Sequence, residues 1–213
     1  RVDRALILGG AALSLPVALQ EARSGQDPGS GMEIDVVEID DAVTQLAREY
    51  FAFGERDRPG IRVYHDDARV FLRSGDDRYD VVYLDVFDHL LTVPWTMVTS
   101  EALQAMSAEL SSDGVFMANV LSPLEGPGTE FLSRFRATLD EAFVDVRLYL
   151  TDEALDPGAT QNLIVVASND PAVLPELDWG QTTIKSGGRP LTDAWAPVEY
   201  LQAKVFAQGL RWR

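Results

Sequence analysis

The sequence contains no cysteine, and His65 and His89 are its only histidines among 213 residues. Without cysteine the chain can form no disulfide, no thiolate nucleophile and no cysteine–zinc site. Two histidines alone also argue against a metal centre. No apolar run reaches the roughly 18 to 20 residues of a membrane-spanning helix, and no signal peptide is recognisable. We therefore expect a cytoplasmic protein with no metal cofactor and no membrane partner.

Basic side chains are scarce as well. There are 18 of them against 34 acidic side chains, which gives a formal net charge of −16. Such a charge repels the phosphates of nucleic acids and anionic membrane surfaces, and it attracts cations. Most of these charges are expected only to keep the protein soluble. The balance nevertheless argues against a nucleic acid partner and is compatible with a small cationic ligand.

Strand-like and helix-like segments alternate along the chain. The expected strands are 4–9, 33–39, 61–65, 79–85 and 113–121, and the expected helices are 15–22, 41–51, 68–74, 100–110 and 128–143. Segments 144–151 and 161–168 follow as an expected antiparallel pair, and Ser100 is expected to cap its helix. Five strand–helix units and a closing pair predict one α/β domain over 1–213, an open and mostly parallel sheet with helices on both faces.

Small and acidic residues follow four of the expected parallel strands. In open parallel sheets ligands bind beyond the carboxyl ends of the strands, near the point where the strand order reverses. Gly9–Gly10, Glu38, Asp67 and the pair Asp85 and Asp88 all occupy such positions. We therefore expect these residues to meet in one crevice.

Gly9 and Gly10 allow a tight turn and a close approach of the backbone to a ligand. Only one of the three glycines of a G-x-G-x-x-G dinucleotide motif is present, so the turn favours a nucleoside over a pyrophosphate, or is simply a turn. Glu38 could accept both hydroxyls of a ribose, or it could be a solvated charge, with Asp40 as the cap of the next helix.

Asp67 could accept a hydrogen bond from the amino group of an adenine, while the amide of Ala68 donates to a ring nitrogen. It could also cap the helix at 68–74, and the two roles can coexist.

The stretch "VVYLDVFDHL" (81–90) runs from a buried strand into two carboxylates. Partial burial of Asp85, and a like charge on Asp88, would raise the pKa of such a group. The pair would then be suited to bind an amine and to take a proton from it. The alternative is a capped surface turn. Asp77 and Asp80, at the opposite end of the strand, are expected to be solvated.

Several of these segments together resemble the spermidine synthase family, the aminopropyltransferases built on the class I S-adenosylmethionine-dependent methyltransferase fold. The segments are "LILGGAALSLP", "VVEID", "DDAR", "YDVVYLDVFDHLLTVPWTMVTSEAL", "LSSDGVFMANVLSP" and "LTDAWAPVEYL", and they extend over nearly the whole chain. The chain is most similar to the bacterial spermidine-synthase-like branch. The resemblance implies a Rossmann-like, mostly parallel seven-stranded sheet with an antiparallel closing strand.

The resemblance also implies an activity in polyamine biosynthesis, the transfer of an aminopropyl group from decarboxylated S-adenosylmethionine to putrescine or a related amine. That co-substrate would lie against Gly9 and Gly10, with Glu38 on its ribose and Asp67 and Ala68 on its adenine. Asp85 would border it and act as the base. Asp88 and Trp195 would bind the amine.

The sequence departs from the family pattern at several places. The glycine-rich turn lacks its third glycine and its usual acid, and His89 stands where a proline is usual. The amino-terminal β-hairpin domain of the family is not in this chain. Two alternatives therefore stay open, a methyltransferase using S-adenosylmethionine or a non-catalytic nucleoside-binding domain. The amine and the oligomeric state, a homodimer included, are undetermined. Phe87, Trp95 and Met97 are expected either to form a lid over the crevice or to pack in the core.

Overall fold

The computed structural model describes residues 2–10, 12–26, 31–51, 58–73, 78–88, 92–174, 176 and 180–209. The strands are β1 (Arg4–Leu8), β2 (Glu33–Val37), β3 (Ile61–Tyr64), β4 (Tyr79–Leu84), β5 (Leu110–Ser122), β6 (Asp145–Leu150), β7 (Gln161–Ser168) and β8 (Gln181–Thr182). The helices are α1 (Ser14–Gln26), α2 (Asp41–Tyr50), α3 (Ala68–Phe71), α4 (Ser100–Ala108), α5 (Glu130–Ala142) and α6 (Val198–Gly209), with 3-10 turns η1 (Trp95–Met97) and η2 (Pro127–Thr129). Among the described residues, no helix is both long enough and apolar enough to cross a membrane.

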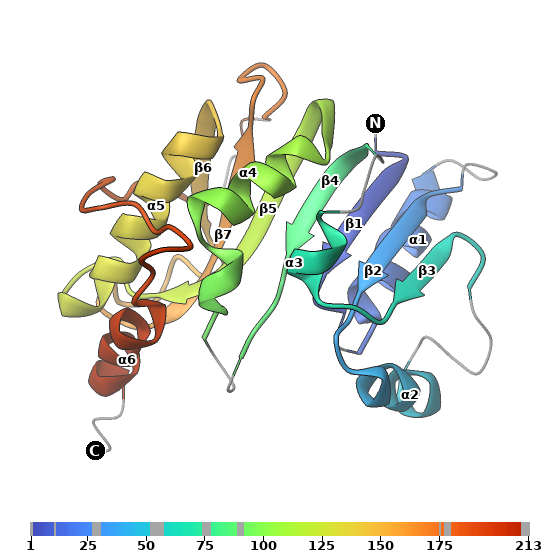
Figure 1. The fold of residues 1–213 in the computed structure, drawn as a ribbon, viewed down its shortest axis with the longest axis horizontal. Helices are drawn as coiled ribbons and strands as arrows, with labels where there is room; N and C mark the ends of the chain where they lie inside the picture. Colours follow the sequence, from blue (N-terminus) through green and yellow to red (C-terminus); the bar gives the residue numbers. More distant parts are fainter. Residues whose placement is uncertain are drawn as a thin grey trace.

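One sheet runs through the molecule in the order β3-β2-β1-β4-β5-β7-β6-β8 (Figure 1). The strands from β3 to β5 are parallel to their neighbours, and β7 is antiparallel to both β5 and β6. This confirms the expected mostly parallel α/β sheet with an antiparallel closing strand. Because β1 lies between β2 and β4, the order of the strands reverses at the carboxyl end of β1.

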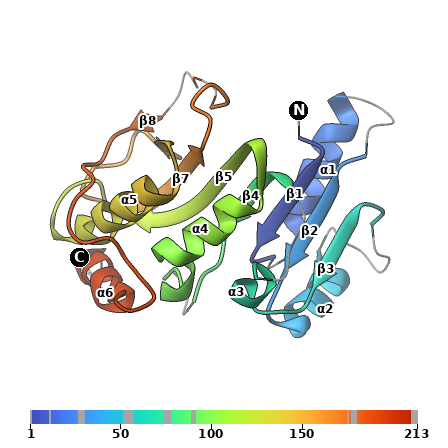
Figure 2. The ribbon, with the colours of Figure 1, turned by 45° about the horizontal axis from the view of Figure 1, so that its top comes forward.

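The described part of the chain has one strand more than the seven expected. Strand β8 pairs with β6 at the outer edge of the sheet (Figure 2). It has only two residues, Gln181 and Thr182. A strand this short has no alternation of apolar residues, and its pairing depends on where the chain happens to pass, so the sequence carries no signal for it.

Helices cover both faces of the sheet, with α4 and α5 on one face and α1 on the other (Figure 1). Side chains of β1 alternate between the two resulting cores. Leu6 and Leu8 belong to the core that also holds residues of α4 and α5. Ala5 and Ile7 belong to the core that contains Val17 of α1. A strand that is buried on both faces has to be apolar throughout, which explains the run that the sequence shows here.

Two local expectations were wrong. Thr99, not Ser100, caps α4, since the Thr99 side chain accepts a hydrogen bond from the Ala102 amide. Ser100 is the first helical residue, and its hydroxyl donates to Glu141 of α5 at 2.6 Å. The correct cap depends on backbone angles at adjacent hydroxyl residues, which their sequence does not distinguish.

Asp80 was expected to be solvated, but it joins β4 to the start of β1. Its carboxylate accepts hydrogen bonds from the amides of Asp3 and Arg4, at 2.7 and 3.0 Å. Ser111 of β5 donates to the other oxygen at 3.3 Å. Asp80 therefore holds the amino-terminal ends of neighbouring strands together. Asp77 lies outside the described residues.

Candidate active site

The ends of the first four strands lie side by side. Backbone hydrogen bonds continue past the strands, from Gly9 N to the Val37 carbonyl and from Asp85 N to the Leu8 carbonyl, both at 2.9 Å. The Glu38 amide donates to the Tyr64 carbonyl at 3.0 Å. The expected convergence of these strand ends is therefore present in the fold.

The turn after β1 requires both of its glycines. Gly9 has a φ of +90°, a conformation that disfavours side chains, and a Cβ at this residue would collide with the carbonyl oxygen of Asp85. A Cβ on Gly10 would lie 2.5 Å from a methyl group of Val36. The backbone of the turn thus passes directly between the ends of β2 and β4.

Glu38 is held beside this turn by backbone amides. One carboxylate oxygen accepts from Gly10 N and the other from Asp40 N, both at 3.1 Å. Its side chain is buried at the end of β2, with the residue 9% exposed. The cap of α2 is Asp40, as expected, because its carboxylate accepts from the Ala42 amide. Glu38 is therefore a fixed acceptor at the edge of the crevice and not a capping residue.

Asp67 does cap the following helix. One of its carboxylate oxygens accepts from the amides of Arg69 and Val70, at 2.7 and 3.1 Å, at the start of α3. Ala68 is the first residue of that helix. The capping prediction is confirmed, and the contact with an adenine stays a prediction.

A cavity of about 300 Å³ opens where these elements meet. Its lining combines predicted site residues with residues that sequence reasoning did not single out. The lining residues are Gly9, Val37, Ile39, Asp66, Asp67, Ala68, Val86, Phe87, Asp88, Pro94, Thr96 and Met97. A volume near the lower end of the range for small-molecule sites, with apolar walls and a few acids, suits a ligand such as a nucleoside.

The expected lid residues divide between two environments. Phe87 and Met97 belong to the cavity wall, and Met97 is buried. Trp95 is 38% exposed and is not among the lining residues. Lining positions such as Ile39 and Thr96 carry no sequence signal, because an apolar or small polar residue after a strand or in a loop has many other uses.

Asp85 lies just past the end of β4, half-buried. The side-chain amide of Asn119, on β5, donates to one carboxylate oxygen at 3.2 Å. Burial raises the pKa of Asp85, and the hydrogen bond from Asn119 acts in the opposite direction. The expected contribution of Asp88 to this pKa is not found. Burial, followed by the charge of Asp85, also raises the pKa of Tyr83 to about 12.

Asp88 lies on the cavity wall in a tight backbone turn. Its amide donates to the Thr92 carbonyl at 2.6 Å, and the Thr92 amide donates back at 3.1 Å. The Thr92 hydroxyl adds a third hydrogen bond to the Asp88 carbonyl at 2.7 Å. These contacts position an exposed carboxylate at the mouth of the cavity. His89 lies outside the described residues.

Trp195 lies elsewhere. The guanidinium groups of Arg134 and Arg189 lie over its ring, 5.1 and 4.9 Å from the ring centroid. It is not among the residues that line the cavity. Two cations on its ring would repel a cationic amine, so the predicted amine contact of Trp195 is left out of the site considered below.

Within the described ranges, no three histidine or acidic side chains come together as a metal-binding group. The expectation that the protein uses no metal is not tested by this observation.

The strand order and the position of the crevice define an α/β domain of the class I methyltransferase type. A probable spermidine synthase from Corynebacterium glutamicum superimposes with a TM-score of 0.63 at 22% identity, covering 99% of this chain and 71% of that one. Human methyltransferase-like protein 13, solved in complex with SAH, gives 0.62 at 22% identity, covering 100% and 84%. At this identity the likeness extends to the fold alone.

Sequence comparison is more specific. The model of the spermine/spermidine synthase domain matches residues 4–169, and the chain belongs to that family. A polyamine aminopropyltransferase from Vibrio vulnificus is 28% identical over 228 aligned positions, which cover 94% of this chain and 70% of that protein.

Proposed function

We propose that the protein transfers an aminopropyl group from decarboxylated S-adenosylmethionine to putrescine or a related amine. The observation that carries this proposal is Asp85, a half-buried carboxylate with a raised pKa at the end of β4, next to a cavity of nucleoside size. Membership of the spermine/spermidine synthase family and the name of the Vibrio vulnificus relative support the same activity. A cytoplasmic location and small-molecule partners belong to this proposal.

The donor would occupy the cavity, with its nucleoside against the turn at Gly9 and Gly10. Glu38, fixed by two backbone amides, would accept hydrogen bonds from the ribose hydroxyls. Asp67 and the amide of Ala68 would recognise the adenine, since both residues line the cavity. These groups hold the donor and leave its sulfonium free to react.

Asp85 would prepare the amine. An alkylammonium has no lone pair, and its pKa is near 10, far above the usual value for an aspartate. Burial of Asp85 raises its pKa and thereby narrows the gap that proton transfer to the carboxylate must cross. The neutral amine then attacks the carbon next to the sulfonium. A carbon–nitrogen bond forms, the carbon–sulfur bond breaks, and its electron pair stays on sulfur in the released methylthioadenosine.

The rest of the site would align the reactants. A sulfonium is already an activated leaving group, so the protein has to supply a neutral amine, correct orientation and a pocket that tolerates cations. Asp88, at the mouth of the cavity, would hold the far amino group of the acceptor. The net charge of −16 would raise the local concentration of a diamine.

A thermal-shift comparison tests the proposal. We expect decarboxylated S-adenosylmethionine and methylthioadenosine to raise the melting temperature by about 5 to 10 °C at 100 times their Kd, and S-adenosylmethionine to have little effect. Incubation of the decarboxylated donor with putrescine should then release methylthioadenosine. Stabilisation by S-adenosylmethionine as well would favour methyl transfer, and stabilisation by none of the three would overturn the proposal.

A further inference from the structure

Asn119 is a polar residue in an otherwise apolar part of β5. Along this strand Phe116, Ala118 and Val120 are buried in the core beneath α4 and α5. Met117 and Asn119 point to the opposite face, because side chains alternate along a strand. Leu84 of β4 pairs with Ala118, so the next residues along each strand, Asp85 and Asn119, are neighbours at the strand ends.

The two ends of the Asn119 amide have different surroundings. Its nitrogen donates to the Asp85 carboxylate at 3.2 Å. Its carbonyl oxygen is buried and accepts no hydrogen bond from the part of the chain that the structure describes. The residue that pairs with Asn119 across the strands is Ile164, whose side chain has no donor. Asn119 thus presents an unpaired acceptor next to the predicted base.

Packing does not account for this amide. A buried acceptor without a partner costs about 1 to 3 kcal/mol, and such groups in native proteins are few. A leucine at the same position would pack beside Met117 and Ile164, which border one apolar groove, without that penalty. A ligand that donates a hydrogen bond to the oxygen would explain why an amide is present.

The acceptor amine has suitable donors. After Asp85 has taken one proton from a primary ammonium, the amine retains two N–H groups and turns its lone pair toward the carbon to be attacked. A secondary amine retains only one N–H group at this stage. Two acceptors around the nitrogen would therefore orient a primary amine fully and a secondary amine only in part.

We propose that Asn119 is a second amine-binding residue, whose nitrogen orients the Asp85 carboxylate and whose carbonyl oxygen accepts an N–H of the acceptor. The site would then select primary amines over secondary amines. This inference rests on the proposed aminopropyl transfer and assigns to that reaction a residue and a class of acceptor.

Substitution Asn119→Leu tests it, with Met117→Leu, on the same face of β5, as the matched control. We expect Asn119→Leu to lower kcat/KM for putrescine by about 10- to 100-fold, because hydrogen bonds to both the amine and the carboxylate are lost. The preference for putrescine over a diamine methylated on both nitrogens should shrink. The acidic limb of the pH profile should move to higher pH, since the Asn119 hydrogen bond favours the charged form of Asp85.

Methylthioadenosine should bind Asn119→Leu as it binds the unaltered protein, and Met117→Leu should retain normal kinetics. Asn119→Gln, which keeps the amide, should recover part of the activity and serves as the second variant if Asn119→Leu fails to fold. If the unaltered protein turns over putrescine while Asn119→Leu has the same kcat/KM, amine preference and pH profile, the role of Asn119 is disproved and the proposed function stands. If the unaltered protein turns over no amine, both proposals fall.

Discussion

The two halves of the crevice are built differently. At the ends of β2 and β3, Glu38 and Asp67 accept hydrogen bonds from backbone amides, which fix their carboxylates to the local chain. At the ends of β4 and β5, Asp85 and Asn119 are joined through their side chains, and the Asn119 carbonyl lacks a partner among the described residues. Groups that only bind can be held firmly by the backbone. A base has to keep an environment in which its protonation state can change, and burial provides this for Asp85.

The largest expected effect is on the β4 side. Asp85→Asn should reduce turnover by about 10²- to 10⁴-fold, because the amide cannot take a proton from the ammonium. Binding of methylthioadenosine should be unchanged, since the nucleoside groups lie on the other strands. Single-turnover kinetics and calorimetry measure the two quantities separately. A variant with full turnover would show that Asp85 is not the base.

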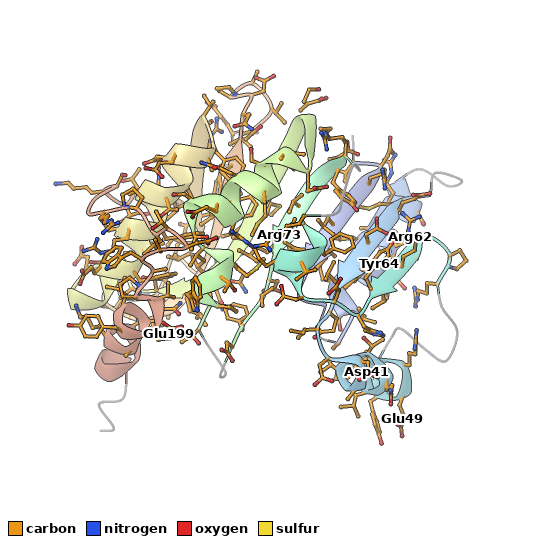
Figure 3. The ribbon with its side chains drawn as sticks, in the orientation of Figure 1. Asp41, Glu49, Arg62, Tyr64, Arg73 and Glu199 are labelled. Carbon is orange, nitrogen blue, oxygen red and sulfur yellow. The ribbon has the colours of Figure 1, made fainter. Side chains whose placement is uncertain are left out.

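A smaller effect is expected on the β2 side, and on binding instead of chemistry. Glu38→Gln replaces a charged acceptor by a neutral amide, so the affinity for methylthioadenosine should fall by about 10-fold. Calorimetry gives the Kd directly. Glu49→Gln is the control, because Glu49 lies on the outer side of α2, away from the sheet (Figure 3). Equal affinities for Glu38→Gln and the unaltered protein would remove Glu38 from the ribose site.

The smallest effect concerns stability. The folded-state pKa of Asp85 lies above its unfolded value, so the folded protein binds this proton more tightly and the charged carboxylate destabilises it. Above the folded-state pKa, Asp85→Asn should therefore melt higher, by about 2 °C at pH 7. The advantage should shrink as the pH falls through the raised pKa toward the unfolded value of about 3.9.

Asp113→Asn provides the opposite sign for this measurement. A hydrogen bond from Ser112 lowers the pKa of Asp113, so its charged form stabilises the folded protein above the unfolded pKa. Asp113→Asn should therefore not raise the melting temperature at pH 7. A higher melting temperature for Asp113→Asn, or none for Asp85→Asn, would contradict the assigned origin of the two shifts.

Much of the fold was predictable because its signals are local. The continuous apolar runs of β1 and β4 predict strands that are buried on both faces. The acids Asp40 and Asp67, immediately before helical segments, predict the caps that the structure contains. Parallel strands then bring their carboxyl ends to one edge, so the convergence of Gly9 and Glu38 follows from topology without any side-chain detail.

The parts that sequence reasoning missed depend on contacts between distant segments. Asn119 was overlooked because its partner, Asp85, is 34 residues away, and only the pairing of β4 with β5 makes them neighbours. Trp195 was assigned to the amine site because aromatic residues suit cations, but Arg134 and Arg189 pack on its ring. Asp80 was taken as solvated because the amides that it accepts from belong to the start of β1.

By itself, the amino-acid sequence determined the alternation of strands and helices, the acidic charge and the order of the acids along the strand ends. These properties depend on residues close together in the chain. Only the tertiary structure decided which acid is tied down by backbone amides, which is partly buried, and which amide lies beside the base. Burial and the approach of polar groups depend on the packing of separate strands, and that packing sets the pKa of Asp85 and leaves the Asn119 oxygen without a donor among the described residues.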